Sequence, residues 1–450
     1  MTKAGNDTNE GGRHRARRGP WWFTWRIALG LLVVVVAWGS LTFYRTWSNS
    51  DGEPTKVIIA TWMRDNHMAP LVAQLEDFYY QHIDTPEVGG EPTVSADLTS
   101  EDTAGLDAED LQAEAAPPPP VSDGSEPLLL TPIDRPRAPN PEPTTATLIL
   151  RPHLSPPASI PSPAKKPEAK EGVWQPVGSR VDGVPAVYVT RVRADDLHTS
   201  YYASAMWIDT ELTKAMFVPG YEEPGGPNPY DGALPRKFWS DVVANFNGGF
   251  RLDDSQGGYY FKGETVRPLV NGKASAVIYK DGSIKIGKWG REVDMTADVA
   301  VVRQNLDLIV DKGKSKVTSG TDNVVWGATT DKESLAWRSA IGQRADGSIV
   351  YVGSPYLSAE GLGNVLVGAG VQRAMVLDMN DWWTAGFYFR HKKNGTPLCR
   401  KLDPAIQEGC DRYLNRYKRD SFQFLIDRGA SVRTTAGEEP LPQPSSSSMP

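Results

Sequence analysis

An uncharged, apolar run of eighteen residues, from Ile27 to Tyr44, constrains this chain more than any other feature. At 1.5 Å of rise per residue, a helix of that length approaches the thickness of the hydrocarbon core of a bilayer. Three tryptophans and, before them, four arginines precede the run. Basic residues on that side predict a cytoplasmic N-terminus. We therefore expect a basic cytoplasmic tail over residues 1–20, a transmembrane helix over residues 21–46 and an extracytoplasmic remainder.

A cleaved signal peptide is the alternative to a permanent anchor. Ala37-Trp38-Gly39 loosely fits the small-x-small pattern of a cleavage site. The apolar run continues beyond that point through Leu41 and Phe43, which favours the anchor. The run has no polar face between Ile27 and Ala37, which argues against a buried helix of a soluble protein. The prediction is a cell-membrane protein with a single span.

Composition divides the rest of the chain. Residues 56–82 form a juxtamembrane amphipathic segment, because apolar residues recur at helical spacing between Ala69 and His82. Residues 83–172 hold half of the 36 prolines and sixteen acidic residues against six basic ones. Such a stretch buries too little apolar surface to offset its ordering entropy, so we interpret it as a disordered linker that holds a domain away from the bilayer. Residues 431–450 are predicted to be a disordered tail.

Residues 173–430 have the composition of a folded domain with many strand signals. Asp281-Gly282 and Asp346-Gly347 each lie between two β-rich runs, which is typical of hairpins. A helical pattern covers residues 358–367 and ends at Gly368. The prediction is an α+β fold: a strand-rich mixed sheet with flanking helices.

Composition also limits the chemistry. Two cysteines exclude a four-cysteine zinc site. In an oxidising compartment Cys399 and Cys410 would form a disulfide, and two free thiols are the alternative. The net charge is -7, and the predicted linker carries more than all of it, so a basic surface for nucleic acid is not supported. No cofactor is evident, although carboxylates near a phosphate site would leave room for a divalent cation.

One short segment carries a specific signal for ligand binding. Residues 242–250 read VVANFNGGF, an apolar strand that ends in two glycines and an aromatic residue. Gly248 and Gly249 would let the backbone approach an anionic group and direct amide N–H groups toward it. Asn247 adds an amide that both donates and accepts hydrogen bonds. The alternative is an ordinary tight turn.

The order of four motifs resembles the phosphodiester glycosidase domain family, over roughly residues 187–426. The motifs are NGGF after the first strand, a block around Lys280-Asp281-Gly282, the segment Trp337 to Gly342 followed by Asp346-Gly347, and the run from Ala369 to Asp378. The anchor, juxtamembrane helix and acidic linker are similar to the actinobacterial branch of that family. The resemblance implies hydrolysis of a sugar-1-phosphodiester.

This sequence departs from the family at the last motif. The family commonly shows Leu-Asp-Gly-Gly-Gly-Ser, whereas residues 377–382 read LDMNDW. Asp378 is retained and the glycines are absent. If those glycines present amides to the substrate phosphate, this chain must bind phosphate differently or bind another group.

Hydrolysis at an anomeric carbon requires stabilisation of an oxocarbenium-like transition state, which carboxylates can supply. Asp378 is the first candidate for base or nucleophile, since it is retained at the family's motif. Its partner is one of four carboxylates: Asp253, Asp254, Glu264 and Asp381. Arg338 is a candidate phosphate clamp, because a guanidinium binds phosphate with two parallel hydrogen bonds. Trp382 or its neighbour Trp383 would stack on a sugar, and the other would lie in the core.

Each candidate also has a structural interpretation. A strand-end aspartate is often a turn former, Asp253-Asp254 would suit a polar loop, and Arg338 would suit an ion pair with a structural acid. The prediction is a membrane-anchored extracytoplasmic glycosidase that acts on sugar phosphodiesters of envelope glycopolymers or glycolipids. The alternatives are a non-catalytic module that binds such ligands and a scaffolding protein.

Overall fold

The computed structural model describes residues 21–50, 52–84, 86–105, 152–317, 323–326 and 335–428. The chain divides into two compact units, Met1–Val72 and Ala73–Pro450, which are considered separately. The predicted cytoplasmic tail, the C-terminal tail and the middle of the predicted linker lie outside the described residues.

The first unit is helical. It contains α1 (Trp21–Ser48) and α2 (Thr55–Asp65), and α3 (Ala69–His82) begins in it and continues into the second unit. Within α1, the 24 residues Trp25–Ser48 are long and apolar enough to cross a membrane, with a mean hydropathy of 2.1. A signal sequence near an N-terminus has the same length and composition, so the helix is consistent with either interpretation. The predicted amphipathic helix at 69–82 is confirmed.

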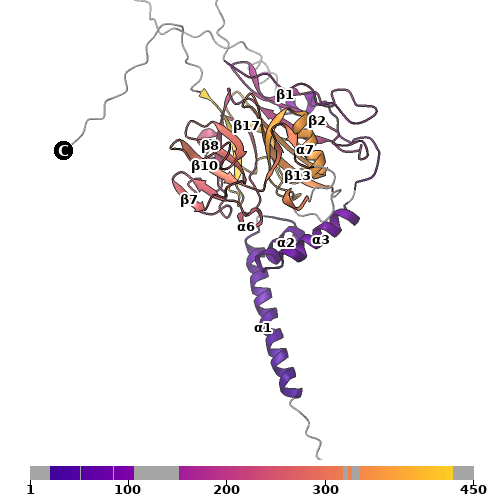
Figure 1. The fold of residues 1–450 in the computed structure, drawn as a ribbon, viewed down its shortest axis with the longest axis vertical. Helices are drawn as coiled ribbons and strands as arrows, with labels where there is room; N and C mark the ends of the chain where they lie inside the picture. Colours follow the sequence, from indigo (N-terminus) through magenta and orange to yellow (C-terminus); the bar gives the residue numbers. More distant parts are fainter. Residues whose placement is uncertain are drawn as a thin grey trace, which may run out of the picture. The chain divides into compact units, whose positions relative to one another are not determined.

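The described part of the second unit contains three β-sheets (Figure 1). The first has eight strands in the order β1 (Gln175–Val181), β2 (Val184–Val192), β3 (Ala203–Ile208), β14 (Ile349–Leu357), β13 (Ala336–Arg344), β15 (Val371–Val376), β11 (Leu308–Asp311) and β12 (Lys314–Ser315). The second is β7 (Glu264–Arg267), β6 (Tyr259–Phe261), β10 (Val299–Gln304), β8 (Ala274–Tyr279) and β9 (Ile284–Lys288). The third is β17 (Pro397–Lys401), β16 (Gly386–His391), β5 (Val242–Asn247), β18 (Ser421–Ile426) and β4 (Thr213–Val218).

The helical elements of this unit are few and short. They are α4 (Thr99–Thr103), α6 (Leu252–Ser255), α7 (Ala359–Gly368) and the 3₁₀ turns η1 (Arg236–Phe238) and η2 (Asn323–Trp326). The predicted α+β class is therefore confirmed. The predicted mixed sheet is corrected, because every strand pair among the described residues is antiparallel. Short connections such as Asp281-Gly282 between β8 and β9 permit only that direction.

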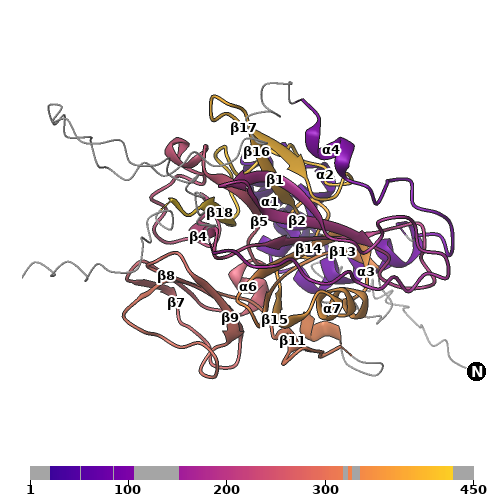
Figure 2. The same cartoon turned by 90° about the horizontal axis from the view of Figure 1, so that it is seen from above.

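Helix α7 covers one face of the eight-stranded sheet (Figure 2). It begins after Ser358, whose hydroxyl accepts a hydrogen bond from the Gly361 N–H at 2.9 Å and caps the helix. Leu362 and Leu366 are fully buried and pack in one cluster with inward-facing residues of β13, β14 and β15. The apolar stripe of α7 thus forms the main core, as the pattern over residues 358–367 predicts.

The third sheet packs on the opposite face of the eight-stranded sheet. Phe246 of β5 stacks on Tyr351 of β14 with ring centroids 4.3 Å apart. Residue parity explains the division: Ala340 faces the α7 cluster, whereas its neighbour Ser339 faces β5. This packing brings the ends of β5 and β15 to Ser339 of β13.

Residues 86–105, here called the N-terminal arm, pack on the second unit instead of forming a linker. Asp102 accepts two hydrogen bonds from the Arg390 guanidinium, with Nε at 2.9 Å, and one from the Gly178 N–H at 2.9 Å. The fully buried Arg191 donates to both carboxylate oxygens of Glu101, at 3.0 and 2.8 Å. Charged groups that look solvated in the sequence therefore meet buried partners.

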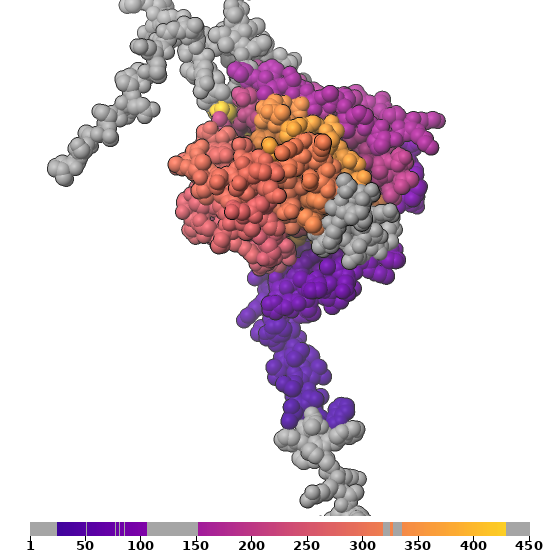
Figure 3. Space-filling model, in the orientation of Figure 1, coloured from indigo at the N-terminus to yellow at the C-terminus, as the bar shows by residue number. Residues whose placement is uncertain are grey.

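Residues 152–172 also belong to the domain. Ile160 lies in the α7 cluster, and the Glu171 carboxylate accepts hydrogen bonds from Ser162 and from the Arg193 N–H. In Figure 3 the magenta atoms of the chain just after residue 152 form one continuous surface with the orange atoms of the later strands. The structure thus differs from the predicted linker over residues 83–172 at both of its ends. The reason is long-range pairing, which composition does not reveal.

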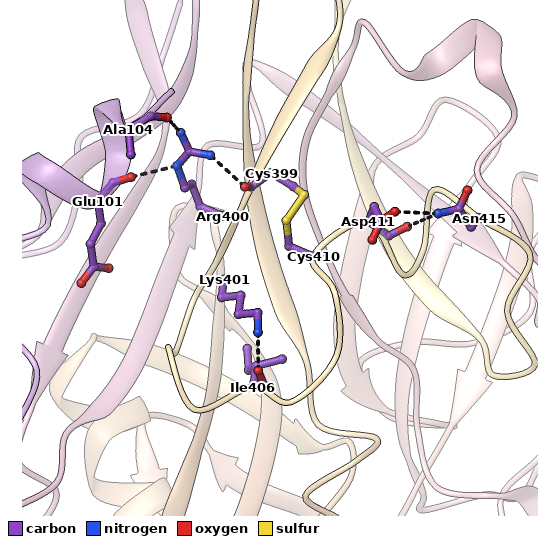
Figure 4. The surroundings of a disulfide bond; sticks show 9 residues. All are labelled: Glu101, Ala104, Cys399, Arg400, Lys401, Ile406, Cys410, Asp411 and Asn415. Carbon is purple, nitrogen blue, oxygen red and sulfur yellow. Dashed lines mark hydrogen bonds between the residues drawn. A yellow bond between two sulfur atoms is a disulfide. The ribbon is translucent and has the colours of Figure 1, made fainter. Parts of the chain in front are cut away.

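Cys399 and Cys410 form a disulfide, as predicted (Figure 4). The bond closes a loop that continues from β17, and beside it the Arg400 guanidinium donates to the backbone oxygens of Glu101 and Ala104. Asp403 of the same loop is buried and accepts hydrogen bonds from the hydroxyls of Ser204 and Ser354, at 2.9 and 2.7 Å. The loop is therefore attached to both the arm and the eight-stranded sheet.

Candidate active site

The ends of β5 and β15 converge at Ser339 of β13. Its hydroxyl accepts hydrogen bonds from the Asn247 side chain at the end of β5 and from the Asp378 N–H just after β15, both at 3.1 Å. The Ser339 N–H in turn donates to the Asp378 backbone oxygen at 2.8 Å. Two of the predicted site residues, Asn247 and Asp378, are therefore brought together through a residue that the sequence reasoning did not single out.

Asn247 is fully engaged within the protein. Its amide oxygen accepts from the Tyr351 hydroxyl at 2.7 Å and from the Ala385 N–H at 3.3 Å. Its amide nitrogen donates to the Gly248 oxygen and to Ser339. All of its strong hydrogen-bonding capacity is used, so Asn247 positions the strand ends and does not present its side chain to a ligand.

The two glycines lie against a buried ion pair, between Arg303 of β10 and Asp420, with Nε and Oδ2 2.7 Å apart. A Cβ at Gly248 would lie 2.3 Å from the Asp420 carboxyl carbon, and one at Gly249 would lie 3.3 Å from the Arg303 guanidinium. Only glycine fits at residue 248. The Gly248 N–H donates to the Asp420 backbone oxygen at 2.8 Å, while the Gly249 N–H has no acceptor among the described residues. Gly249 is thus the amide of the pair that remains for a ligand.

Asp378 is paired with Arg419. The carboxylate accepts from the Arg419 Nη2 at 3.1 Å through Oδ2 and from the Met379 N–H at 2.8 Å through Oδ1. Burial alone lowers the pKa of the Arg419 guanidinium, but the carboxylates of Asp378, Glu223 and Asp420 outweigh burial and raise this pKa above its ordinary value. The result is a permanently charged arginine beside an almost buried carboxylate.

Arg419 keeps donors for a ligand. Its Nη2 donates to the Asp378 carboxylate and to the Gly249 oxygen. Nε and Nη1 have no acceptor among the described residues, and 11% of the side chain is exposed. The guanidinium carbon lies 4.8 Å from the ring centroid of Trp383, within the range of a cation–π contact. Sequence reasoning missed Arg419, and its only signal is the basic pair at residues 418–419 directly before β18.

Glu223 is a second carboxylate at this place. Arg251 donates from Nε to its Oε1 at 2.9 Å, and the Glu223 side chain is 20% exposed. It also acts on the charge of Arg419, as the raised pKa of that arginine indicates. The carboxylates of Asp378 and Glu223 thus both raise the pKa of the Arg419 guanidinium. Nothing local in the sequence around residue 223 indicates this role.

The altered last motif forms a tight turn without glycine. The Asn380 side-chain oxygen accepts from the N–H groups of Trp382 and Trp383, at 2.9 and 3.4 Å. Asp381 accepts from Gln407 at 2.9 Å. The Trp382 ring lies 5.5 Å from the Arg412 guanidinium, whereas Trp383 is the tryptophan beside Arg419. Both tryptophans are 8% exposed, and the stacking of one of them on a sugar stays a prediction.

Arg338 lies away from the Asp378 carboxylate. It is the neighbour of Ser339 in β13, so its side chain faces the other side of the sheet. It is 1% exposed, and its Nε donates to the Leu357 oxygen at 2.8 Å. Burial lowers its pKa to about 10. The predicted phosphate clamp at Arg338 is thus corrected: the arginine beside Asp378 is Arg419.

Three predicted carboxylates are not gathered at the site. Asp253 and Asp254 are exposed on α6, and Glu264 is exposed at the start of β7. Asp253 pairs with Arg267 at 2.9 Å and not with any residue of the Asp378 group. Their proximity to NGGF in the sequence does not persist in space, because α6 leads the chain away into the second sheet.

No group of three or more His, Cys, Asp or Glu side chains among the described residues is arranged to hold a metal ion. The divalent cation therefore stays a prediction.

Residues 240–378 match the model of the phosphodiester glycosidase family. This chain contains a phosphodiester glycosidase domain. The matched region begins before β5 and ends at Asp378, so it includes the Asn247, Ser339 and Asp378 group, and Glu223 and Arg419 lie outside it. The resemblance inferred from the motif order is thus confirmed.

Solved structures show similarity at low sequence identity. The catalytic domain of zebrafish N-acetylglucosamine-1-phosphodiester alpha-N-acetylglucosaminidase, auto-inhibited by its pro-peptide, is 15% identical with a TM-score of 0.36, over 56% of this chain and 87% of that one. A hypothetical protein from Synechocystis is 10% identical (TM-score 0.34; 54% and 63% covered). A putative exported protein from Burkholderia pseudomallei is 10% identical (TM-score 0.26; 50% and 74% covered). No curated protein matches the sequence significantly.

Proposed function

We propose that this protein is a membrane-anchored, extracytoplasmic hydrolase that cleaves the bond between a sugar and phosphate in a sugar-1-phosphodiester of the cell envelope. The family match supports the reaction class. The observation that carries the assignment to a site is the Asp378–Arg419 pair, a carboxylate beside a guanidinium with unused donors. The zebrafish relative is named for removing N-acetylglucosamine from such a diester.

The chemistry assigns a part to each charged group. The bond between the anomeric carbon and the phosphate oxygen breaks, and its electron pair leaves with the phosphomonoester. A water oxygen bonds to the anomeric carbon, and Asp378 accepts the proton of that water. Positive charge develops on the sugar ring in the transition state, and the carboxylates of Asp378 and Glu223 stabilise it. A phosphomonoester is a good leaving group, so its departure does not need strong general-acid catalysis. The protein has only to bind the phosphate in the correct position.

Arg419 and the Gly249 amide are the phosphate ligands in this proposal. The free Nε and Nη1 of Arg419 form the planar donor pair that suits two phosphate oxygens. The Gly249 N–H adds a neutral donor from the other strand end. The phosphate would therefore lie next to Asp378, which places the anomeric carbon within reach of that carboxylate.

The direct test is hydrolysis by the full-length protein in detergent. A panel of sugar-1-phosphodiesters is incubated with and without EDTA, and the free sugar and the phosphomonoester are both quantified. We expect equal amounts of the two products from wild type and none from Asp378→Asn. Loss of activity in EDTA, with recovery when Mg²⁺ or Ca²⁺ is added, would show that the reaction requires a metal ion.

A non-catalytic sugar-phosphate-binding protein is the second candidate. The glycines absent from the LDMNDW turn and the fully engaged Asn247 favour it, because both reduce the number of groups free to act on a substrate. Binding of the same compounds without release of sugar, unchanged in Asp378→Asn, would establish it. Absence of both binding and release would reject the two functions together.

A further inference from the structure

The folded domain begins much closer to the apolar helix α1 than the composition indicates. Helix α1 ends at Ser48, and the second compact unit begins at Ala73. Tyr80 of α3 is buried within that unit. Tyr356 of β14 donates to Asp84 at 2.8 Å, directly after α3. The chain is therefore attached to the domain from α3 onward.

The N-terminal arm keeps the chain attached through its whole length. Beyond the Asp102 and Glu101 pairs, Arg193 binds Glu91 at 2.8 Å, and the Gln175 side chain bonds the Leu98 N–H and the Ala96 oxygen. Ala96 and Leu98 are fully buried. These contacts involve β1, the edge strand of the eight-stranded sheet, and its neighbour β2, so the arm packs on the domain itself.

The chain returns to the same body after residue 151. The Leu154 N–H donates to the buried Asp209 carboxylate at 2.8 Å, and Ile160 enters the main core. Both ends of residues 106–151 are thus held by one domain. A segment held in this way adds nothing to the distance between the domain and a membrane, whatever its length.

Chain length then bounds the reach of the domain. Residues 49–72 connect α1 to the second unit, and eleven of them form α2. Helix and extended chain together span at most about 60 Å. A ninety-residue proline-rich spacer over residues 83–172 would have allowed about 280 Å. The structure reduces the reach several-fold.

We infer that the domain acts on sugar phosphodiesters carried by lipids of its own bilayer, because the connection between α1 and the domain is short. The inference rests on the proposed function and on α1 as a permanent anchor. A short connection confines enzyme and lipid headgroups to one thin layer, which raises their effective concentration without any additional contact. Polymers distant from the membrane lie beyond this reach.

The experiment uses full-length protein in phosphatidylcholine vesicles. The substrates are a sugar-1-phosphodiester of hexadecanol in the bilayer and the same sugar-1-phosphodiester of methanol in solution. The hexadecyl substrate is placed either in the protein's own vesicles or in separate ones, at equal total concentration. We expect at least about tenfold faster hydrolysis in shared vesicles, while the methyl substrate is cleaved equally in both arrangements.

Two matched insertions test the topology. The same 72-residue Gly-Ser sequence is inserted after Ser50 or after Pro120. The insertion after Ser50 thickens the accessible layer and should reduce the rate in shared vesicles about twofold, because the reach of a flexible chain grows with the square root of its length. The insertion after Pro120 should have no effect.

The outcomes separate the two levels of the proposal. Cleavage of the methyl substrate without an advantage for shared vesicles overturns the lipid assignment and leaves the proposed function intact. Equal effects of the two insertions would show that residues 106–151 are a spacer. Failure to cleave either substrate rejects the proposed function, and this inference with it.

Discussion

Two aspartate–arginine pairs in this protein have the same composition and different consequences. Asp102 and Asp378 are each 4% exposed, and each accepts one backbone N–H and one guanidinium. Arg390 binds Asp102 with both Nε and Nη2, across 288 residues of sequence. Arg419 binds Asp378 with Nη2 alone, across 41 residues.

The two pairs differ in the number of hydrogen-bond donors that each arginine has left for another group. Arg390 uses both Nε and Nη2 to bind Asp102, and this contact attaches the N-terminal arm to β16. The single contact of Arg419 leaves Nε and Nη1 open where the ends of β5 and β15 meet. An ion pair with matched donors stabilises a fold, and one with unused donors beside a carboxylate is suited to binding an anion.

The largest effect is expected from removing the Asp378 charge. Asp378→Asn should lower kcat/KM for a sugar-1-phosphodiester by about 10²- to 10⁴-fold, because a general base is lost. The hydrogen bonds of its backbone to Ser339 remain, but the Arg419 guanidinium loses its carboxylate partner, so stability should also fall and activity is compared per folded molecule. Asp254→Asn, at an exposed carboxylate, is the control and should retain full activity. Equal losses in the two variants would contradict the assignment.

Breaking the other pair should affect stability instead. Arg390→Met leaves the Asp102 carboxylate buried without its cation and should cost about 3–5 kcal/mol in urea unfolding. The double variant with Asp102→Asn should recover part of this loss, because no buried charge remains. Activity per folded molecule should be unchanged. A loss of kcat with normal stability would show that the arm, too, serves the reaction.

Arg419→Lys is expected to affect selectivity for phosphate. A lysine retains the charge and loses the planar fork, so affinity for a sugar 1-phosphate should fall about tenfold to a hundredfold, measured by calorimetry. Affinity for the unphosphorylated sugar should change much less. Arg338→Lys, at the buried arginine on the opposite face of β13, should not produce this selectivity. Equal loss of both ligands in Arg419→Lys would reject the phosphate role.

A smaller, pH-dependent effect is expected at Asp403. Burial raises the pKa of its carboxyl, and hydrogen bonds from Ser354, Ala405 and Ser204 only partly compensate. A carboxyl with a raised pKa in the folded state contributes its full stability below the unfolded pKa of about 3.9 and loses it as pH rises through the folded value. The stability advantage of wild type over Asp403→Asn should therefore shrink as pH rises from about 3.5 to about 7 in urea unfolding. An advantage that grows with pH would contradict the raised pKa.

Local patterns in the sequence predicted much of the domain correctly. The Asp-Gly turns gave the β8–β9 and β13–β14 hairpins, and Ser358 with Gly368 bounded α7. Period-two and period-3.6 patterns predict such elements because burial acts on neighbouring residues. Two features could be established only from the strand register. They are the antiparallel arrangement of the sheets and the separation of Arg338 and Ser339 onto opposite faces of β13.

The candidate site could be predicted only at its strand ends. Asp378 and Asn247 follow apolar strands within recognisable motifs, so sequence position indicated them. Glu223 and Arg419 come from segments 155 and 41 residues away from Asp378, with no motif of their own. The exposed carboxylates Asp253, Asp254 and Glu264 were predicted because they are near NGGF in the sequence, and α6 carries them elsewhere.

The sequence by itself determined the apolar helix, the strand-rich class, the family of the domain and the aspartate at the last motif. These depend on composition, local periodicity and short motifs. Only the tertiary structure decided that the acidic arm belongs to the domain and which arginine lies beside Asp378. Each of these depends on pairs such as Asp102 and Arg390, whose members are distant in the sequence. The energy of such a pair depends on its desolvation and its geometry, and a sequence pattern reveals neither.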